Sequence, residues 1–568
     1  MSWITNHKFK FFLSLALLIS LGLSIYSLAN VDQTSTFTTF GLQSGNREGG
    51  FKAPDSSPSV PAQDGSSSST DRGAGPAWGQ GSTDGTTANP GFTRPSGTDG
   101  PMGAQGARDG MSGMSGMGRG GMGGFSGFGN GQYGKSLAVY AVIFGGLLAA
   151  AFYYTLRGRF EIKENRKPLI LGLLLASGLF LKIAAAPWIT GYQSDINFFK
   201  TWATQAADSL SGFYLNSSSD YPPLYMYVLY LTGKIVTLPQ AVPYFMPLIK
   251  LPSILADTVT AYLLYKAARR FFSFEMGLWI AAFYMFNPAV LINATFWGQV
   301  DSFFTMIVVA GIFLLTRQKW GWATAVITLS VLMKPQGIIY VPVLFFALVQ
   351  SRAIKPWLKA AGAGILTTLI VVLPFSSGQE PLWLYNLYTG TVNEYPYASV
   401  NAYNLFALLG ANYTESASTF VVFSYHTWGL IFIVLTTLYT GWMVLRSRNT
   451  AIVSLGALLQ IAGVFTFSSS MHERYLFPAA ALAVLAYAYW RDKRLLWLAF
   501  GFSTTIFLNT YAVFYGYVSQ GSTIGFLLFT TSLLNIAMCG LLIKVMWDVS
   551  SKTKSREALL PAVTAVVS

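Results

Sequence analysis

The stretch "AIVSLGALLQIAGVFTFSSSMHERYLFPAAALAVLAYAYW", residues 451–490, decides the fold class. Two apolar runs flank a short polar centre in which His472, Glu473 and Arg474 are consecutive. A helix of about 20 apolar residues is long enough to cross the hydrocarbon core of a bilayer. Ionisable groups beside such helices are costly to bury, so they mark a functional site in a membrane protein.

The rest of the chain has the same apolar character. Its 568 residues are 52% hydrophobic and 15% aromatic, with only 11% charged, which excludes an ordinary soluble domain. The sequence therefore predicts an all-α polytopic membrane protein with about 11 to 14 transmembrane helices. The clearest apolar runs lie at 11–29, 136–156, 168–187, 250–267, 275–295, 357–375, 427–446, 450–469, 475–490, 495–518 and 523–545.

The net charge of +14 does not indicate a nucleic-acid partner, because the Lys and Arg residues lie in short loops between apolar runs. The positive-inside rule places such loops in the cytoplasm. It then predicts that four segments share the outer face of a plasma membrane. These segments are 188–221, 296–301, 376–425 and 470–474. The single cysteine lies in an apolar run, so neither a disulfide framework nor a cysteine metal site is expected.

Composition divides the chain into successive parts. The basic, apolar start could be a secretory signal, but no small-residue cleavage site follows it, which favours a retained helix. The Gly-, Ser- and Met-rich segment after it cannot bury enough apolar surface to fold and is expected to be disordered. The expected parts are 1–29, an N-terminal transmembrane helix; 30–134, an outer linker; 135–167, a further helix with a basic cytoplasmic loop; 168–490, the membrane core; 491–546, C-terminal transmembrane helices; and 547–568, a cytoplasmic tail.

Two segments do not fit a simple crossing pattern. If 222–239 crosses the membrane, the helix after it runs in the wrong direction; either this run dips in without crossing or the charge rule fails locally. The segment 320–350 has two apolar arms too short to span, separated by Lys334 and Pro335. It is expected to form a broken hairpin whose tip lies inside the protein.

Acidic residues are scarce outside the linker, and several lie on the expected outer face. Asp195 follows an apolar run, Asp220 precedes two prolines, and Gln299 and Asp301 begin another run. Each has a simpler interpretation, since Asp220 and Asp301 could cap helices and Arg474 could be an interfacial anchor. Their gathering on one face favours a joint function instead.

These residue types suit transfer of a group from a lipid phosphate. A carboxylate can act as general base toward a hydroxyl or amine acceptor. Cationic side chains such as Arg474, His472 and Lys334 can hold a phosphate leaving group. The sequence contains no Walker loop, no Rossmann fingerprint after a strand and no HExxH or CxxC motif, so nucleotide-sugar chemistry has no visible site.

Several motifs resemble the GT-C superfamily, polytopic glycosyltransferases that take sugars from polyprenyl-phosphate carriers. "SDINFFKTWA" is similar to the superfamily's catalytic Asp in the first large outer loop. "DYPPLYMY" and "MHERYLFP" resemble the "DYPPL" and "HEK" motifs of endoplasmic-reticulum glucosyltransferases that use dolichyl-phosphate glucose, with Arg474 in place of the lysine. The set "FWGQVDSFF", "LMKPQGIIYVP" and "SVNAYNLFALLG" looks most like bacterial proteins related to GPI mannosyltransferase II and to protein O-mannosyltransferases.

The resemblance implies a GT-C-type bundle whose catalytic core is 168–490 and whose outward-facing site is formed by outer loops. It assigns the general base to Asp195 and makes Asp220 the second acid. His472 and Arg474 would bind the donor phosphate, and Glu473 would orient one of them. The pocket would be lined by Asp301, Gln299 and Lys334.

The resemblance also implies the reaction and its partners. The donor is a polyprenyl-phosphate hexose, with mannose the expected sugar, and the acceptor is a glycan, a lipid or a protein. Attack opposite the phosphate inverts the anomeric carbon. A divalent metal serves some members of the superfamily and not others, and no compact acidic cluster in the sequence demands one.

A transporter or flippase of lipid-linked sugars is the rival interpretation, because broken helices are common in transporters. The sequence shows no internal repeat, however, and its polar groups gather on one face rather than at the midplane.

Overall fold

The computed structural model describes residues 2–31, 133–158, 161–162, 167–447, 449–517 and 525–564. Nearly all of the predicted linker, 30–134, lies outside these residues. The described part is helical, with short 3-10 and π-helical turns among the α-helices, apart from its loops, a two-stranded antiparallel hairpin and a few isolated bridges. Its elements are α1 (Ser2–Ala29), α2 (Gly134–Leu156), α3 (Lys167–Ala185), η1 (Ala186–Trp188), α4 (Gln193–Asp208), α5 (Phe213–Asn216), α6 (Leu224–Val236), η2 (Pro239–Tyr244), α7 (Phe245–Ala268), α8 (Phe274–Met285), α9 (Pro288–Leu291), η3 (Ile292–Trp297), α10 (Asp301–Thr316), α11 (Trp320–Val331), η4 (Pro335–Tyr340), α12 (Val341–Ser351), α13 (Ile354–Val372), η5 (Leu373–Phe375), α14 (Trp383–Asn393), α15 (Leu405–Leu408), β1 (Thr419–Phe420), β2 (Phe423–Ser424), α16 (Tyr425–Arg446), α17 (Ile452–Phe467), α18 (Pro478–Trp490), α19 (Lys493–Phe514) and α20 (Phe526–Thr564).

The predicted class, an all-α polytopic membrane protein, is confirmed. Within the described residues, nine helices are long and apolar enough to cross a membrane. Shorter apolar helices of 10–17 residues lie among them, including α10, α17 and α18. The expected 11 to 14 crossings therefore require some of these shorter helices to span as well.

The stretch that decides the fold class forms the centre of the bundle. Every residue of α17 from 452 to 466 is buried, as is every residue of α18 from 478 to 488. A helix that is apolar on all sides has no face for water and is stable only when other helices surround it. The loop with His472, Glu473 and Arg474 joins these two central helices, so its position is fixed from both sides.

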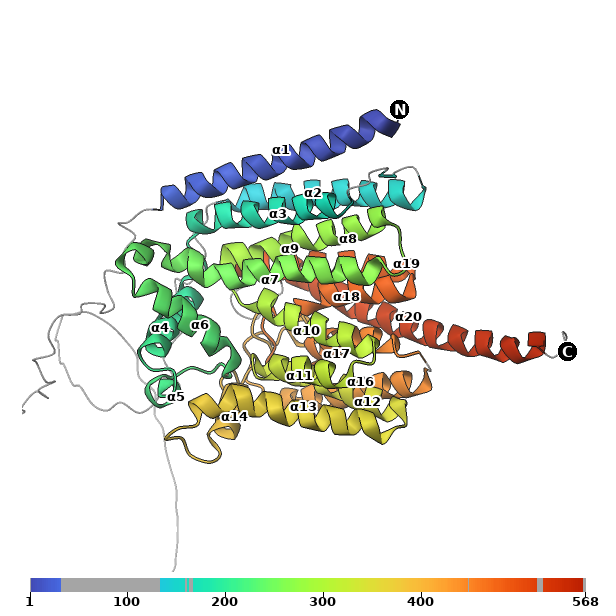
Figure 1. Cartoon of the computed structure of the whole chain (residues 1–568). Helices are drawn as coiled ribbons and strands as arrows, with labels where there is room; N and C mark the ends of the chain where they lie inside the picture. The colour runs from blue at the N-terminus through green and yellow to red at the C-terminus, as the bar shows by residue number, and fades with distance from the viewer. Residues whose placement is uncertain are drawn as a thin grey trace, which may run out of the picture. The chain divides into compact units, whose positions relative to one another are not determined.

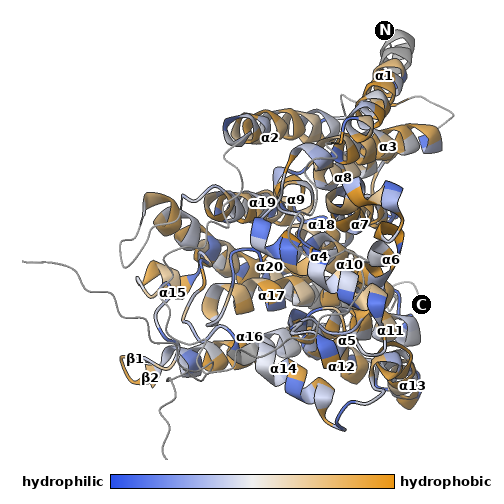
Figure 2. Cartoon of the chain, turned by 90° about the vertical axis from the view of Figure 1, so that its left-hand side faces the viewer, coloured by the Kyte–Doolittle hydropathy of each residue, from blue (hydrophilic) through white to orange (hydrophobic). Residues whose placement is uncertain are grey.

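The long helices run side by side, and α4, α5, α6 and α14 lie beyond one end of them (Figure 1). Figure 2 views this end and shows hydrophilic residues on α4 and α14, whereas α13 and α19 are mostly hydrophobic. The loops that join α7 to α8 and α12 to α13 lie at the opposite end (Figure 1). We call the end with α4 the polar end.

The structure settles how 222–239 is arranged. Its helix α6 has only 13 residues, about 20 Å, and it packs on α4 at the polar end, where α3 ends and α7 begins (Figure 1). The segment therefore does not cross the bundle. The basic loop after α7 lies at the opposite end, as the charge rule requires.

The broken hairpin of 320–350 is also present. Helix α11 ends at Val331, and a 3-10 turn begins at Pro335 before α12 returns. Lys334 lies between the two arms and is only 4% exposed. A Cβ at Gly337 would collide with the backbone of Ser330, so only glycine allows the two arms to approach this closely.

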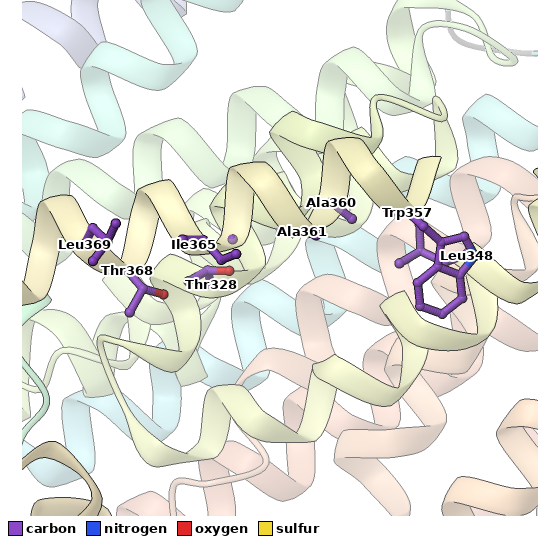
Figure 3. Close-up of a pocket in the computed structure, with 9 residues that line it drawn as sticks. Thr328, Leu348, Trp357, Ala360, Ala361, Ile365, Thr368 and Leu369 are labelled. Atoms are coloured by element: carbon purple, nitrogen blue, oxygen red, sulfur yellow. The ribbon is translucent and has the colours of Figure 1, made fainter. Parts of the chain in front are cut away.

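An apolar cavity of about 550 Å³ lies between α11, α12 and α13 (Figure 3), and none of the predicted site residues lines it. No ionisable side chain lines it. The lining residues are Thr328, Leu348, Trp357, Ala360, Ala361, Gly364, Ile365, Thr368 and Leu369.

Candidate active site

The segments predicted to share the outer face come together at the polar end. The backbone N–H of Tyr192 donates to the carbonyl of Trp297 over 3.0 Å. Val400 N–H donates in the same way to the carbonyl of Met471 over 2.9 Å. These bonds join the loops before α4 and after α17 to segments distant in sequence.

Two glycines allow the loop before α4 to approach the loop before α10. Gly191 and Gly298 have φ angles of +84° and +86°, which side chains with a Cβ rarely adopt. A Cβ at Gly298 would lie 2.5 Å from Cδ1 of Ile196, and a Cβ at Gly191 would lie 2.7 Å from Cγ1 of Ile196. The glycines thus hold one isoleucine between two loops and bring the first turn of α4 against Trp297.

Side chains of helix α7 donate hydrogen bonds to the segment before α4 and to the loop before α10. The Nζ of Lys250, which is fully buried, donates to the carbonyls of Ile189 at 2.5 Å and Ala186 at 3.2 Å. Ser253 Oγ, one turn further on, donates to the carbonyl of Gln299 at 2.8 Å. These bonds satisfy carbonyls that would otherwise be buried without partners.

Asp195 lies in the first turn of α4 with its carboxylate held by two donors. Its Oδ2 accepts hydrogen bonds from the indole Nε1 of Trp297 at 2.7 Å and from the amide Nε2 of Gln299. Among the described residues, every hydrogen bond and ion pair of this carboxylate involves Oδ2. The other oxygen, Oδ1, is therefore left for a ligand, and the side chain is 17% exposed.

Asp301 and Lys334 form a buried ion pair beside Arg474. Lys334 Nζ lies 2.5 Å from Asp301 Oδ1, and the two side chains are 5% and 3% exposed. Asn293 Nδ2 donates to Asp301 Oδ2 at 2.9 Å. Asn293 belongs to the π-helical turn Ile292–Trp297, and such turns are frequent at functional sites.

Arg474 joins these carboxylates to the central loop. Its Nη1 lies 2.6 Å from Glu473 Oε1, whereas Nη2 is 3.7 Å from Asp195 Oδ2 and Nε is 3.8 Å from Asp301 Oδ2. Its guanidinium stacks over the Trp297 ring at 5.3 Å. The Nε group is buried and has no hydrogen-bond acceptor among the described residues. A buried donor of this kind favours binding of an anionic oxygen.

His472 lies beside this cluster but adds no charge to it. Burial, followed by the nearby charges of Arg474 and Lys334, lowers the pKa of His472 to about 3. Its ring meets Tyr395 edge-on at 4.5 Å, and its Nδ1 is 3.9 Å from Glu473 Oε2. At neutral pH it can therefore contact a phosphate only as a neutral imidazole.

Asp220 lies near this cluster and has a perturbed carboxyl group. Burial and then the charge of Glu394 raise the pKa of Asp220 to about 6, although Lys334 acts in the opposite direction. Its backbone carbonyl accepts a hydrogen bond from Thr391 Oγ1 at 2.9 Å. No hydrogen bond to its carboxylate from another described side chain is recorded, but Asp195 and Lys334 are both near enough to influence its proton affinity.

The simpler interpretations of these residues do not fit the structure. Val300 is the N-cap of α10, and Asp301 is already inside the helix. Pro223 occupies the N-cap position of α6, three residues after Asp220. Arg474 is 15% exposed and ion-paired, which is unlike an interfacial anchor whose charged head reaches water.

The structure adds groups that the sequence did not single out. Trp297 lies within a quoted motif, yet nothing in the motif showed that its indole binds Asp195. Tyr192 stacks on Trp297 at 4.4 Å, and the Tyr221 ring lies 5.5 Å from Lys334 Nζ. Asn293 and Glu394 had no sequence signal, since each depends on a turn or loop whose geometry is set by tertiary contacts.

The side chains that could hold a metal ion are scattered over the described residues. Among them, no three His, Cys, Asp or Glu side chains form a group suited to a metal ion. The dependence on a divalent metal that the resemblance allows therefore stays an untested expectation.

One family model matches part of the chain. Residues 175–350 match the family model described as "Alpha-(1->6)-mannopyranosyltransferase, N-terminal domain". A search of the curated proteins found no match. The matched region contains five of the eight predicted site residues, whereas the three of the central loop lie after it; the five are Asp195, Asp220, Gln299, Asp301 and Lys334. This similarity supports glycosyltransferase activity for the chain.

Proposed function

We propose that the chain is a glycosyltransferase that transfers mannose from a polyprenyl-phosphate sugar to an extracytoplasmic acceptor, with inversion. One observation carries the proposal: a carboxylate with one free oxygen, Asp195, lies 3.7 Å from a guanidinium, Arg474, whose buried Nε lacks an acceptor. The similarity to mannopyranosyltransferases supports mannose as the sugar.

Asp195 acts as the general base. The hydrogen bonds from Trp297 and Gln299 hold the carboxylate in one orientation. Its Oδ1 takes the proton of the acceptor hydroxyl while that oxygen attacks the anomeric carbon, and a positioned base contributes about 10²- to 10⁴-fold to rate. Because the new bond forms opposite the breaking bond to phosphate oxygen, a single displacement inverts the configuration.

Arg474 binds the departing lipid phosphate. As its bond to the sugar breaks, the bridging oxygen keeps the electron pair and becomes negative, and a fixed cation stabilises that charge. The Nε and Nη2 groups are available for this purpose, since they are 3.8 Å and 3.7 Å from the carboxylates they face. Glu473 Oε1 lies 2.6 Å from the third nitrogen of Arg474, Nη1, and so fixes the orientation of the guanidinium group.

Lys334 and Asp220 complete the two sides of the site. Asp301 neutralises the charge of Lys334. Lys334 therefore positions the side chains beside the phosphate and adds no net positive charge to the site. Asp220, with its pKa raised to about 6, is mostly ionised at neutral pH and can hold a hydroxyl of the sugar or acceptor. His472 contributes a neutral hydrogen bond, and Gln299 acts through Asp195.

The direct test is transfer by the purified full chain in proteoliposomes. We would supply polyprenyl-phosphate [³H]mannose, with a membrane extract from the producing cell as the acceptor source, and compare it with GDP-[³H]mannose. The proposal predicts a new glycosidic linkage and released polyprenyl phosphate with the lipid donor alone. Transfer from GDP-mannose without any lipid donor would contradict it.

The same assay separates the enzyme from the rival transporter or flippase. A transporter would move the labelled lipid between leaflets without releasing polyprenyl phosphate. Sidedness is read by adding the acceptor only outside or only inside sealed vesicles. Transfer is expected only where the polar end of the bundle faces the acceptor.

A further inference from the structure

A basic cavity lies at the end of the bundle opposite Asp195. A cavity of about 490 Å³ opens there between the ends of α7, α10 and α18. Helix α10 begins at Asp301 and ends at Thr316, so its 16 residues separate the two sites by about 24 Å (Figure 1). The cavity is lined by Lys266, Ala267, Arg269, Arg270, Phe313, Arg317 and Tyr489.

The charge of this cavity is one-sided. Four cationic side chains line it and no carboxylate does. Within the described part of the chain, none of the four forms an ion pair with Asp or Glu. Arg269 is engaged, since its Nη1 donates to the carbonyl of Phe272 at 2.5 Å. The other three are exposed cations around an aromatic floor.

Arg270 and Arg317 line the same cavity from different segments. Each guanidinium lies over the ring of a nearby phenylalanine, at 5.7 Å for Phe271 and 5.2 Å for Phe313. Both line the cavity together with Tyr489, whose hydroxyl is hydrogen-bonded to Thr316 Oγ1 at 2.6 Å. Two guanidinium groups on the wall of one cavity are a donor set that suits phosphate oxygens.

Lys and Arg residues whose only role is to set the orientation of the chain in the membrane need not line one cavity. The positive-inside rule is satisfied by Lys and Arg anywhere in the loops of one face. Cations that converge on one cavity repel each other unless an anion lies between them. Basic pockets between transmembrane helices commonly bind acidic lipid head groups.

We propose that this cavity binds a phosphate group that carries net negative charge, with Arg270 and Arg317 as its main ligands. An anionic phospholipid head group and free phosphate share this chemistry. The aromatic floor and the position at the end of membrane-spanning helices favour the lipid. This site is independent of the proposed transfer reaction, and it needs no residue of the polar end.

The test measures thermal unfolding of the full chain in micelles of a neutral detergent. The probes are dioctanoyl phosphatidylglycerol, dioctanoyl phosphatidylcholine and inorganic phosphate, each titrated separately. A ligand that binds only the folded state raises the unfolding temperature with a dependence that reports its affinity. The variant is Arg270→Gln/Arg317→Gln, and the matched control is Lys355→Gln/Lys359→Gln, which removes two exposed charges from the start of α13.

We expect phosphatidylglycerol to stabilise the native chain and the control with equal affinity, and the double variant to bind it about 30-fold more weakly. Phosphatidylcholine should give no saturable shift. If inorganic phosphate alone reproduces the shift and the variant loses it, the ligand is free phosphate. If the control loses affinity as much as the variant, or the native chain does not distinguish the two lipids, the proposal is wrong. Should the double variant fail to fold, Arg317→Gln alone carries the same test.

Discussion

Replacing Asp220 with asparagine should stabilise the protein at neutral pH while it removes a polar group of the proposed site. Burial and the charge of Glu394 raise the pKa of Asp220 from 3.8 to about 6. A carboxyl whose pKa is raised in the folded state destabilises that state once pH exceeds its unfolded value, because the unfolded chain then loses its proton more readily. At about 1.4 kcal/mol for each tenfold change in proton affinity, Asp220→Asn should increase the free energy of unfolding by about 3 kcal/mol at pH 7.

The pH dependence of this gain identifies its cause. Between pH 4 and pH 6 the folded state holds the Asp220 proton and the unfolded state releases it, so the penalty grows through this window and then levels off. The gain should therefore be about half as large at pH 5 as at pH 7 and below about 1 kcal/mol at pH 4.

The assay is reversible unfolding of the detergent-solubilised full chain at these three pH values. Asp208→Asn is the matched control, because Asp208 is exposed at the far end of α4, and it should change stability by less than about 0.5 kcal/mol. The reasoning is refuted if Asp220→Asn is no more stable than the native chain at pH 7, or if its gain is the same at all three values.

Three further substitutions test the packing and the site. Trp297→Phe replaces a fully buried indole with a smaller ring and removes the donor to Asp195, so it should slow transfer about 10- to 100-fold and also lower the free energy of unfolding by about 1–3 kcal/mol through the cavity it leaves. Lys182→Met leaves Asp257 without its buried partner at 2.7 Å and should lower the free energy of unfolding by about 3–5 kcal/mol. The double variant Lys182→Met/Asp257→Leu should recover most of this loss, and no recovery would contradict the pairing. Gly298→Ala places a Cβ on a backbone with φ of +86°, which costs at least about 1–2 kcal/mol of strain in the folded state. The unfolding temperature and the rate of transfer should therefore both fall.

The membrane fold could be predicted because hydropathy reports it directly. The apolar runs of the sequence correspond to α2, α3, α7, α13, α16, α17, α18 and α19 within about five residues, whereas α1 begins earlier, α20 extends further, and the run 275–295 is divided between α8, α9 and η3. The interruption of the apolar run at Lys334 and Pro335 correctly predicted a broken hairpin, because neither apolar arm is long enough to span a membrane. Whether the run 222–239 crosses the bundle could not be decided from the sequence, since a run of spanning length and a short helix at one end of the bundle have similar composition.

The gathering of the site residues could be predicted only in part. The charge rule placed Asp195, Asp301 and Arg474 on one face, and the structure brings them within 4 Å of one another through Arg474. The partners of each group could not be predicted, because they depend on a π-helical turn and on two glycines with positive φ. The neutral state of His472 was missed as well, since burial in the folded chain causes it.

The most direct measurement of the central claim is the rate of mannose transfer from polyprenyl-phosphate mannose by Asp195→Asn. This change keeps the shape and removes the charge of the proposed base, and Asp208→Asn makes the same change on the same helix. We predict a loss of about 10²- to 10⁴-fold for Asp195→Asn and native transfer for Asp208→Asn, with native unfolding temperatures for both. A folded Asp195→Asn protein that transfers mannose within a few-fold of the native rate would contradict the claim.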